Sequence, residues 1–108
     1  MILAFEDDGC VHLYASLDAV VLQIEALDIE GSVHEVFDDG GQRYAVEWIR
    51  PNKRGWIGVS NGEYRLVPSG RPDPNALIQA LDRVGSRGLT EDDIAYVDAL
   101  RRRLATAS

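Results

Sequence analysis

The side chains in this chain with the most familiar chemistry are the carboxylates of three acidic clusters. The phrases "FEDDG" at 5–9, "FDDGG" at 37–41 and "TEDDI" at 90–94 hold them. Paired carboxylates can bind divalent metals, but a calcium loop needs alternating acids that end in a Glu, and residues 38–41 lack that spacing. A two-metal hydrolase would usually add His or Lys at recognisable positions. We therefore expect no metal site and no cofactor here.

The same acidic phrases are typical of turns and helix ends. An Asp side chain bonds to its own backbone two residues on, and the Gly that follows it supplies a positive φ. The acids of "TEDDI" stand where a helix would begin, where carboxylates meet the positive end of the helix dipole. The clusters therefore indicate turns first and surface charge second.

Cys10 and His12 form a second candidate centre, with His34 as a distant third member. Two residues apart on a strand, they would share one face, as a Cys–His nucleophile or half of a metal site requires. Strand neighbours point in parallel, however, and zinc sites normally show a second close ligand pair. A reactive thiolate also needs a positive setting, whereas this strand follows acids at 6–8. We expect no catalysis here.

The stretch "WIRPNKRGW" at 48–56 is a basic island with a Trp at each end. Such surfaces can stack bases or grip anionic ligands. The interpretation that we favour is a hairpin loop in which Pro51 and Gly55 make the turn and the cations protect a sheet edge. No phosphate-binding, dinucleotide-binding, nucleophile-elbow or zinc-protease motif is present. The sequence thus predicts no enzyme.

Composition limits the partners. Eighteen acids against eleven bases give a net charge of -7, which repels phosphate backbones and anionic lipid. The single cysteine cannot form an internal disulfide, and the first residues lack a basic segment typical of a signal peptide, so we expect a cytoplasmic protein. No apolar run approaches the ~18 residues of a membrane helix. Neither nucleic acid nor membrane is an expected partner.

The elements that must position these residues begin with a hairpin and a helix. Apolar runs at 2–5 and 11–15 flank Asp8-Gly9, where we expect the chain to turn. Apolar residues then recur at helical spacing over 17–29, with Ser16 as the N-cap and Gly31 just beyond the end.

Residues 33–68 have a period of two, which predicts an antiparallel meander. Asn61-Gly62 is its clearest turn, of type I′, and it would pair Ser60 with Glu63 and Ile57 with Leu66. This register sends alternate side chains to opposite faces. The inward set is Ile57, Val59, Tyr64 and Leu66, and the outward set is Gly58, Ser60, Glu63, Arg65 and Trp56.

The C-terminal third predicts a helical hairpin. Asp73 caps a helix with Pro74 at its first position and Gly85 at its end, and Thr90 begins the next helix. The expected fold is a single α+β domain, 1–108, with a four- to five-stranded antiparallel meander, an N-terminal helix and this hairpin. Its parts are a strand-helix-meander section, a linker and the helical hairpin, at 1–68, 69–75 and 76–108.

The stretch "LYASLDAVVLQIEALDIEGSVHEVFDDGG", residues 13–41, looks like the opening of small uncharacterised bacterial proteins. In size, acidity and layout the whole chain resembles small cytosolic immunity proteins that neutralise bacterial toxins. The resemblance implies a protein-binding inhibitor whose partner is a cognate toxin domain with a basic active-site surface.

An inhibitor of this kind gains association rate from carboxylates and lifetime from an aromatic anchor. The residues expected to bind the partner are Asp38, Asp39, Glu47, Trp56 and Glu63. The alternative function is a small-ligand module or an enzyme whose site forms from residues scattered over the sheet and the helical hairpin.

Overall fold

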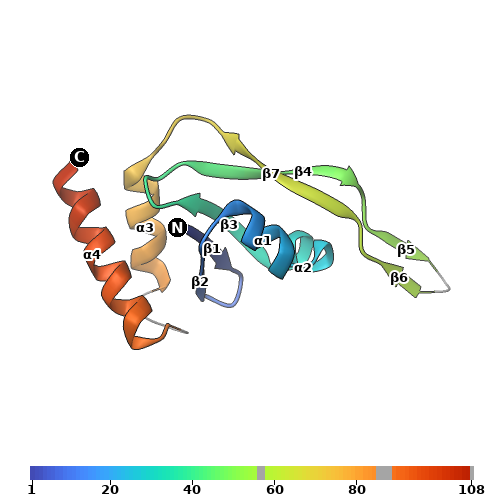
Figure 1. The fold of residues 1–108 in the computed structure, drawn as a ribbon, viewed down its shortest axis with the longest axis horizontal. Helices are drawn as coiled ribbons and strands as arrows, with labels where there is room; N and C mark the ends of the chain where they lie inside the picture. Colours follow the sequence, from blue (N-terminus) through green and yellow to red (C-terminus); the bar gives the residue numbers. More distant parts are fainter. Residues whose placement is uncertain (56–57, 85–88, 108) are drawn as a thin grey trace.

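The computed structural model describes residues 1–55, 58–84 and 89–107 (Figure 1). Within these ranges the chain forms a five-stranded antiparallel sheet in the order β2-β1-β3-β4-β7, with helices on both faces. The α+β prediction is confirmed. The strands of this sheet are β1 Ile2–Glu6, β2 Val11–Tyr14, β3 Val33–Asp38, β4 Arg43–Arg50 and β7 Glu63–Ser69. A separate two-stranded sheet contains β5 Lys53–Gly55 and β6 Gly58–Ser60.

The predicted turn at Asp8-Gly9 is confirmed. The Gly9 amide donates to the Glu6 carbonyl at 3.1 Å, and Gly9 has a φ of 85°. That conformation strains any residue with a Cβ, so glycine suits the position. After the turn, β2 pairs with β1, whose other edge pairs with β3. The first strand therefore lies inside the sheet, and the strands do not follow a simple meander order.

The helix predicted over 17–29 is two helices, α1 Leu17–Gln23 and α2 Ala26–Gly31. Its start is correct, because the Ser16 hydroxyl accepts a bond from the Ala19 amide at 3.1 Å. Its course is wrong, because Ile24 is extended at φ -101° and ψ 115°. The Tyr64 hydroxyl donates to the Ile24 carbonyl at 2.7 Å and so satisfies a group that a continuous helix would have bonded itself. Gly31 ends α2 rather than lying beyond it.

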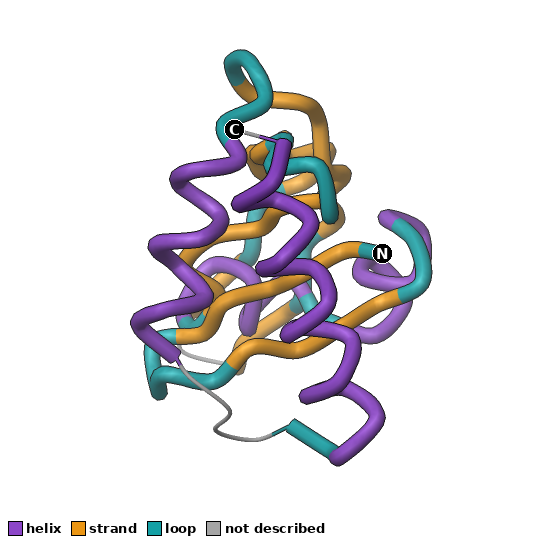
Figure 2. The backbone as a smooth tube through the Cα atoms, turned by 90° about the vertical axis from the view of Figure 1, so that its left-hand side faces the viewer, coloured by secondary structure: helices purple, strands orange, loops and turns teal. Residues whose placement is uncertain are grey.

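The C-terminal helical hairpin is present as α3 Pro74–Val84 and α4 Glu91–Ala107. The Asp73 carboxylate accepts from the Ala76 amide at 3.1 Å and the Thr90 hydroxyl from the Asp93 amide at 3.2 Å, so both predicted N-caps are confirmed. Gly85, the predicted helix end, lies outside the described residues. Figure 2 looks onto α3 and α4, which lie side by side in front of the strands.

The sheet separates two apolar cores, because successive side chains of a strand point to opposite faces. Leu3 and Phe5 of β1 face α3 and α4, whereas Ile2 and Ala4 face α1 and α2. The first core is completed by Val11, Phe37, Leu77, Ala80, Leu81, Val97, Leu100 and Leu104. The second is completed by Val20, Ile24, Ala26, Ile29, Val36, Tyr64 and Leu66.

Asn61-Gly62 is not a hairpin turn, so that prediction is wrong. Ser60 pairs with Lys53 in the β5–β6 sheet, and Glu63 pairs with Arg50 of β4. Gly62 is not among the described glycines that have a positive φ. A type I′ turn would require a positive φ at both central residues. A Cβ on Gly62 would lie 2.1 Å from the Arg50 carbonyl oxygen, so glycine here permits a close approach of two backbones.

The predicted inward and outward side chains of β7 are correct, although the predicted turn is absent. Tyr64 and Leu66 are buried, and Glu63 and Arg65 are exposed, as the period of two predicts. Trp56 and Ile57 lie outside the described residues, as do the side chains of Gly58, Val59 and Ser60. The basic island does belong to a hairpin, but its strands run on to Gly55 and Gly58, so the chain does not turn between Pro51 and Gly55.

We call residues 48–55 and 58–63 the arm. The strands β4 and β7 lead into β5 and β6, and Figure 1 shows this ribbon projecting beyond α2. The molecule measures 51 × 29 × 21 Å, and the arm lies along the longest dimension. Among the described residues, none of the helices has the length and apolar character that crossing a membrane requires.

Candidate protein-binding surface

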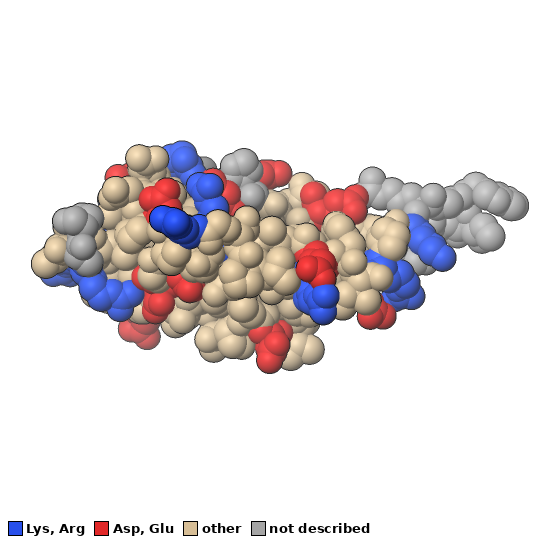
Figure 3. Space-filling view, turned by 90° about the horizontal axis from the view of Figure 1, so that it is seen from above, with Lys and Arg blue, Asp and Glu red and all other residues tan. Residues whose placement is uncertain are grey.

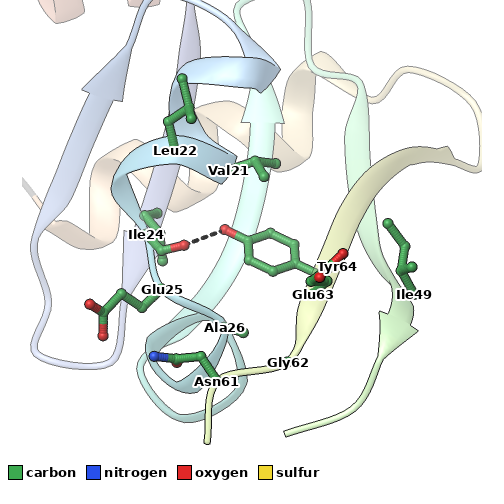
Figure 4. A pocket seen from close by; sticks show the side chains of 10 residues that line it. All are labelled: Val21, Leu22, Ile24, Glu25, Ala26, Ile49, Asn61, Gly62, Glu63 and Tyr64. Carbon is green, nitrogen blue, oxygen red and sulfur yellow. Dashed lines mark hydrogen bonds between the residues drawn. The ribbon is translucent and has the colours of Figure 1, made fainter.

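A groove of about 430 Å³ lies between the α1–α2 pair and the base of the arm. Figure 4 shows its lining, with Tyr64 at the centre, Val21 and Leu22 on α1, and Ile49 on β4. The remaining lining residues are Ile24, Glu25, Ala26, Asn61, Gly62 and Glu63. The groove therefore joins three segments that are far apart in the sequence.

The groove presents apolar side chains to solvent. Leu22 is 86% exposed and Ile49 is 60% exposed, and Val21 beside them is also exposed. Trp48, a further exposed residue, packs edge-on against Tyr64 with ring centroids 6.0 Å apart. The β4–β7 register shifts between Trp48 and Arg50, so two successive apolar residues stand at the end of β4. Contiguous exposed apolar surface of this kind marks interaction sites in soluble proteins.

Tyr64 fixes the groove but has no spare polar group for a ligand. Its side chain is buried, and its hydroxyl is committed to the Ile24 carbonyl. Burial, with a smaller contribution from Tyr14, raises the pKa of Tyr64 to about 12. The phenol therefore stays neutral at physiological pH, and its role is to hold the end of α1 against β7.

Two asparagines attach the base of the arm to α2. The Asn52 amide donates to the Ala26 carbonyl at 2.9 Å and to the Glu30 carboxylate at 3.0 Å, and its oxygen accepts from the Gly62 amide at 2.7 Å. The Asn61 oxygen accepts from the Leu27 amide at 3.2 Å. The sequence predicted a turn at Asn61 and no role for Asn52, because their partners on α2 are more than twenty residues away.

Charge is distributed unevenly along the chain. Residues 1–42 hold ten acids and no Lys or Arg, whereas 43–108 hold eight acids and all eleven bases. On α1–α2 and the segment between them, Asp18, Glu25 and Asp28 have no ion pair or side-chain hydrogen bond within the part of the chain that the structure describes. Of these three, Glu25 lines the groove, so the helical side of the groove carries a negative charge without an ion pair in the described residues.

The arm has the opposite sign. Residues 48–62 contain three bases, Arg50, Lys53 and Arg54, and no acid. Arg50 lies 3.2 Å from Glu63, while Lys53 is exposed. Figure 3 shows Lys and Arg side chains, in blue, toward the right-hand end of the molecule, with Asp and Glu side chains, in red, close to them.

Asp38 and Asp39, the first predicted partner-binding residues, are engaged within the fold. The Asp38 carboxylate accepts from the Gly40 and Gln42 amides, both at 2.9 Å, and from the Tyr44 hydroxyl at 3.3 Å. Asp39 lies 3.7 Å from the N-terminal nitrogen and 3.8 Å from Arg103. These contacts support the interpretation of "FDDGG" as a turn.

Asp39 also contacts α4 through Tyr96, whose hydroxyl donates to it at 3.3 Å. Burial, followed by the charge and hydrogen bond of Asp39, raises the pKa of Tyr96 to about 12. The turn therefore links the N-terminal strand, β3 and the last helix, which is a structural role.

The other predicted residues lie on the ribbon. Glu47 forms an ion pair with Arg65, and Glu63 with Arg50, across β4 and β7. Trp56 lies outside the described residues. The turn at Asp38 precedes β4, whereas Glu63 pairs at its far end, roughly 25 Å away for a strand of this length. The predicted residues thus do not form one patch, and of the four described, Glu63 lines the groove.

Cys10 directly precedes β2, and His12 lies within it. His12 Nε2 lies 3.3 Å from a Glu6 carboxylate oxygen, and the Cys10 amide is bonded to Asp8. No group of three or more His, Cys, Asp or Glu side chains in the described ranges could hold a metal ion.

Comparison with known proteins adds no relative to this geometry: no family model, curated protein or solved structure matches the chain. The function must therefore be argued from the groove, its charge and the arm.

Proposed function

We propose that this protein is a protein-binding inhibitor that covers a basic surface of its partner with the groove and the adjoining face of α1 and α2. One observation carries the proposal: Leu22, the most exposed large apolar side chain of the described residues, lines the groove and belongs to residues 1–42, which hold ten acids and no Lys or Arg. An apolar centre with a charged rim is the composition of specific protein interfaces.

The two features act on different steps of binding. Leu22 and Ile49 lose water on contact and slow dissociation, as buried interface anchors do. Asp18, Glu25 and Asp28 attract a basic partner over a distance and speed association. The expected partner therefore presents an apolar side chain surrounded by Lys or Arg.

Enzymes that act on nucleic acids or nucleotides present such basic clefts to their anionic substrates. The resemblance to cytoplasmic immunity proteins makes a toxin of this class, encoded beside the gene for this chain, the first partner to test. The proposed interface replaces Asp38 and Asp39, which are bonded within the fold, with Leu22, Ile49 and Glu25.

A small ligand is the weaker proposal. The groove volume is in the range of ligand pockets. Two of its polar side chains, however, are already committed, Tyr64 to Ile24 and Asn61 to Leu27. A polar ligand would find few free groups to orient it.

The test is binding kinetics between this protein and the neighbouring toxin domain at several salt concentrations. Leu22→Ser should speed dissociation roughly thirtyfold, which corresponds to a hot-spot cost of about 2 kcal/mol. Glu25→Lys should slow association and reduce its salt dependence. Thr106→Ala, at an exposed position of α4, is the control and should bind normally. Wild-type kinetics for Leu22→Ser and Glu25→Lys would reject this surface.

A further inference from the structure

The arm is weakly supported by its own molecule. Beyond its base, β5 and β6 pair with each other as a separate two-stranded sheet rather than as part of the five-stranded one. An isolated two-stranded ribbon is at best marginally stable in water. A chain that extends such a ribbon from its body gains stability when another surface covers it.

The surface that best complements the arm lies on the same chain. The arm holds three bases and one acid, Glu63, which pairs with Arg50, while α1 and α2 with their connection hold Asp18, Glu25, Asp28 and Glu30 and no base. Apolar groups match as well, because the base of the arm exposes Trp48 and Ile49, and α1 exposes Leu22. Opposite charges around an apolar contact favour association and fix its register.

We propose that two copies of this chain associate through their arms, each arm lying against α1 and α2 of the other copy. The arrangement has twofold symmetry, so the same pair of surfaces is used twice.

A second copy fits the arm better than a nucleic acid does. Three cations on the arm would attract a phosphate backbone, but the adjoining helices and the net charge of -7 would repel it. In the dimer the same helices attract the arm. This inference goes beyond the proposed function, and because both use the face of α1 and α2, a toxin domain and a second copy would compete for that face. The test of the dimer uses the protein alone, so its failure is distinguishable from failure of the proposed function.

The test is sedimentation velocity over protein concentrations from about 1 to about 200 µM, chosen to bracket a micromolar dissociation constant. The mass should rise from one chain toward two. The dissociation constant should increase between about 50 and about 500 mM salt, because exposed charge pairs are screened. A mass of one chain over the whole concentration range would overturn the proposal. Binding of duplex DNA by that monomer would not restore it.

Charge exchange makes the test specific. Lys53→Glu with Arg54→Glu should give a monomer, and so should Glu25→Lys with Asp28→Lys in a separate variant. An equimolar mixture of the two should form a heterodimer, because opposite charges then meet at both arm sites: the acidic arm faces the basic helices, and the basic arm faces the acidic helices. Circular dichroism like that of the wild type shows that each variant is folded.

Arg71→Glu provides the control, since Arg71 is an exposed base in the segment before α3. This variant should dimerise normally. A dimer that persists in both double variants, or two monomeric variants that do not combine on mixing, would contradict the exchange of arms.

Discussion

At the scale of single residues, the shape of the groove depends on the absence of a side chain at Gly62 and on the hydroxyl of Tyr64. Gly62 lets the two backbones of the ribbon come together, since a Cβ there would meet the Arg50 carbonyl and the Pro51 carbonyl carbon within 2.6 Å. Tyr64, two residues further on, reaches from β7 to the end of α1. Both residues shape the junction from which the arm leaves the body.

Gly62→Ala should therefore lower the free energy of unfolding by at least about 2 kcal/mol, because the neighbouring atoms are backbone and cannot move aside cheaply. Gly31→Ala is the matched control: Gly31 lies in α2 with nothing within 4 Å of its Cβ position. Alanine there should raise the free energy of unfolding by about 0.5–1 kcal/mol. Urea denaturation followed by tryptophan fluorescence measures both. Equal effects of the two substitutions would contradict the close approach.

Tyr64 and Tyr96 predict an alkaline loss of stability. Burial raises the folded-state pKa of both side chains to about 12, above the ordinary tyrosine pKa of 10.0 that applies when the chain is unfolded. Their neutral forms thus contribute stability that is complete below pH 10 and is lost as the pH rises toward 12. The free energy of unfolding should fall over this interval and should fall less in Tyr64→Phe. Urea denaturation at several pH values measures the difference, and identical pH profiles would contradict it.

At the scale of elements, the sequence predictions are correct where an element depends on contacts between near neighbours in the chain. They are wrong where the element depends on residues far along the chain. The hairpin at Asp8-Gly9 and the N-caps at Asp73 and Thr90 depend on bonds over two or three residues, and all are present. At the break in the N-terminal helix, the Ile24 carbonyl accepts a bond from Tyr64, which is forty residues further along the chain. The spacing of apolar residues on a helix carries no sign of such a contact.

For the candidate site too, the sequence predicts the local features but not those that depend on contacts between distant parts of the chain. The acidic phrases at 5–9 and 37–41 form the predicted turns, and the acids at 91–93 lie in the first turn of α4 as predicted. In the second turn the Asp38 carboxylate accepts from the Gly40 and Gln42 amides. The groove itself was not predictable, because it needs Leu22, Ile49 and Tyr64 to be brought together by the helix break and the bulge in β4. The lack of Lys and Arg over 1–42 was visible in the sequence and would have indicated the acidic side.

The base of the arm gives a prediction about an element. Asn52→Ala removes bonds to Ala26, Glu30 and the Gly62 amide, so the arm should loosen from α2. We expect a loss of about 1–3 kcal/mol in stability and faster hydrogen exchange at the Gly62 amide. Asn75→Ala, at an exposed position in α3, should change neither. Unchanged exchange at Gly62 in Asn52→Ala would show that Asn52 does not hold the arm.

At the scale of the whole molecule, the chain is elongated, with like charges collected in different regions. The five-stranded sheet and its helices form a body, the acids of 1–42 lie within that body, and the arm carries three bases away from it (Figure 1). The apolar groove lies where these regions meet. Because the groove is open and its border is negative, a basic protein surface is the complement that this shape and charge favour.

The most direct test of the proposed surface is to map the binding site by the amide chemical shifts of this protein as the neighbouring toxin domain is added. The account predicts that the largest changes fall on α1, α2, residues 48–50 and residues 61–64. Changes confined to the Asp38-Asp39 turn and α4, with α1, α2 and the base of the arm unaffected, would contradict it.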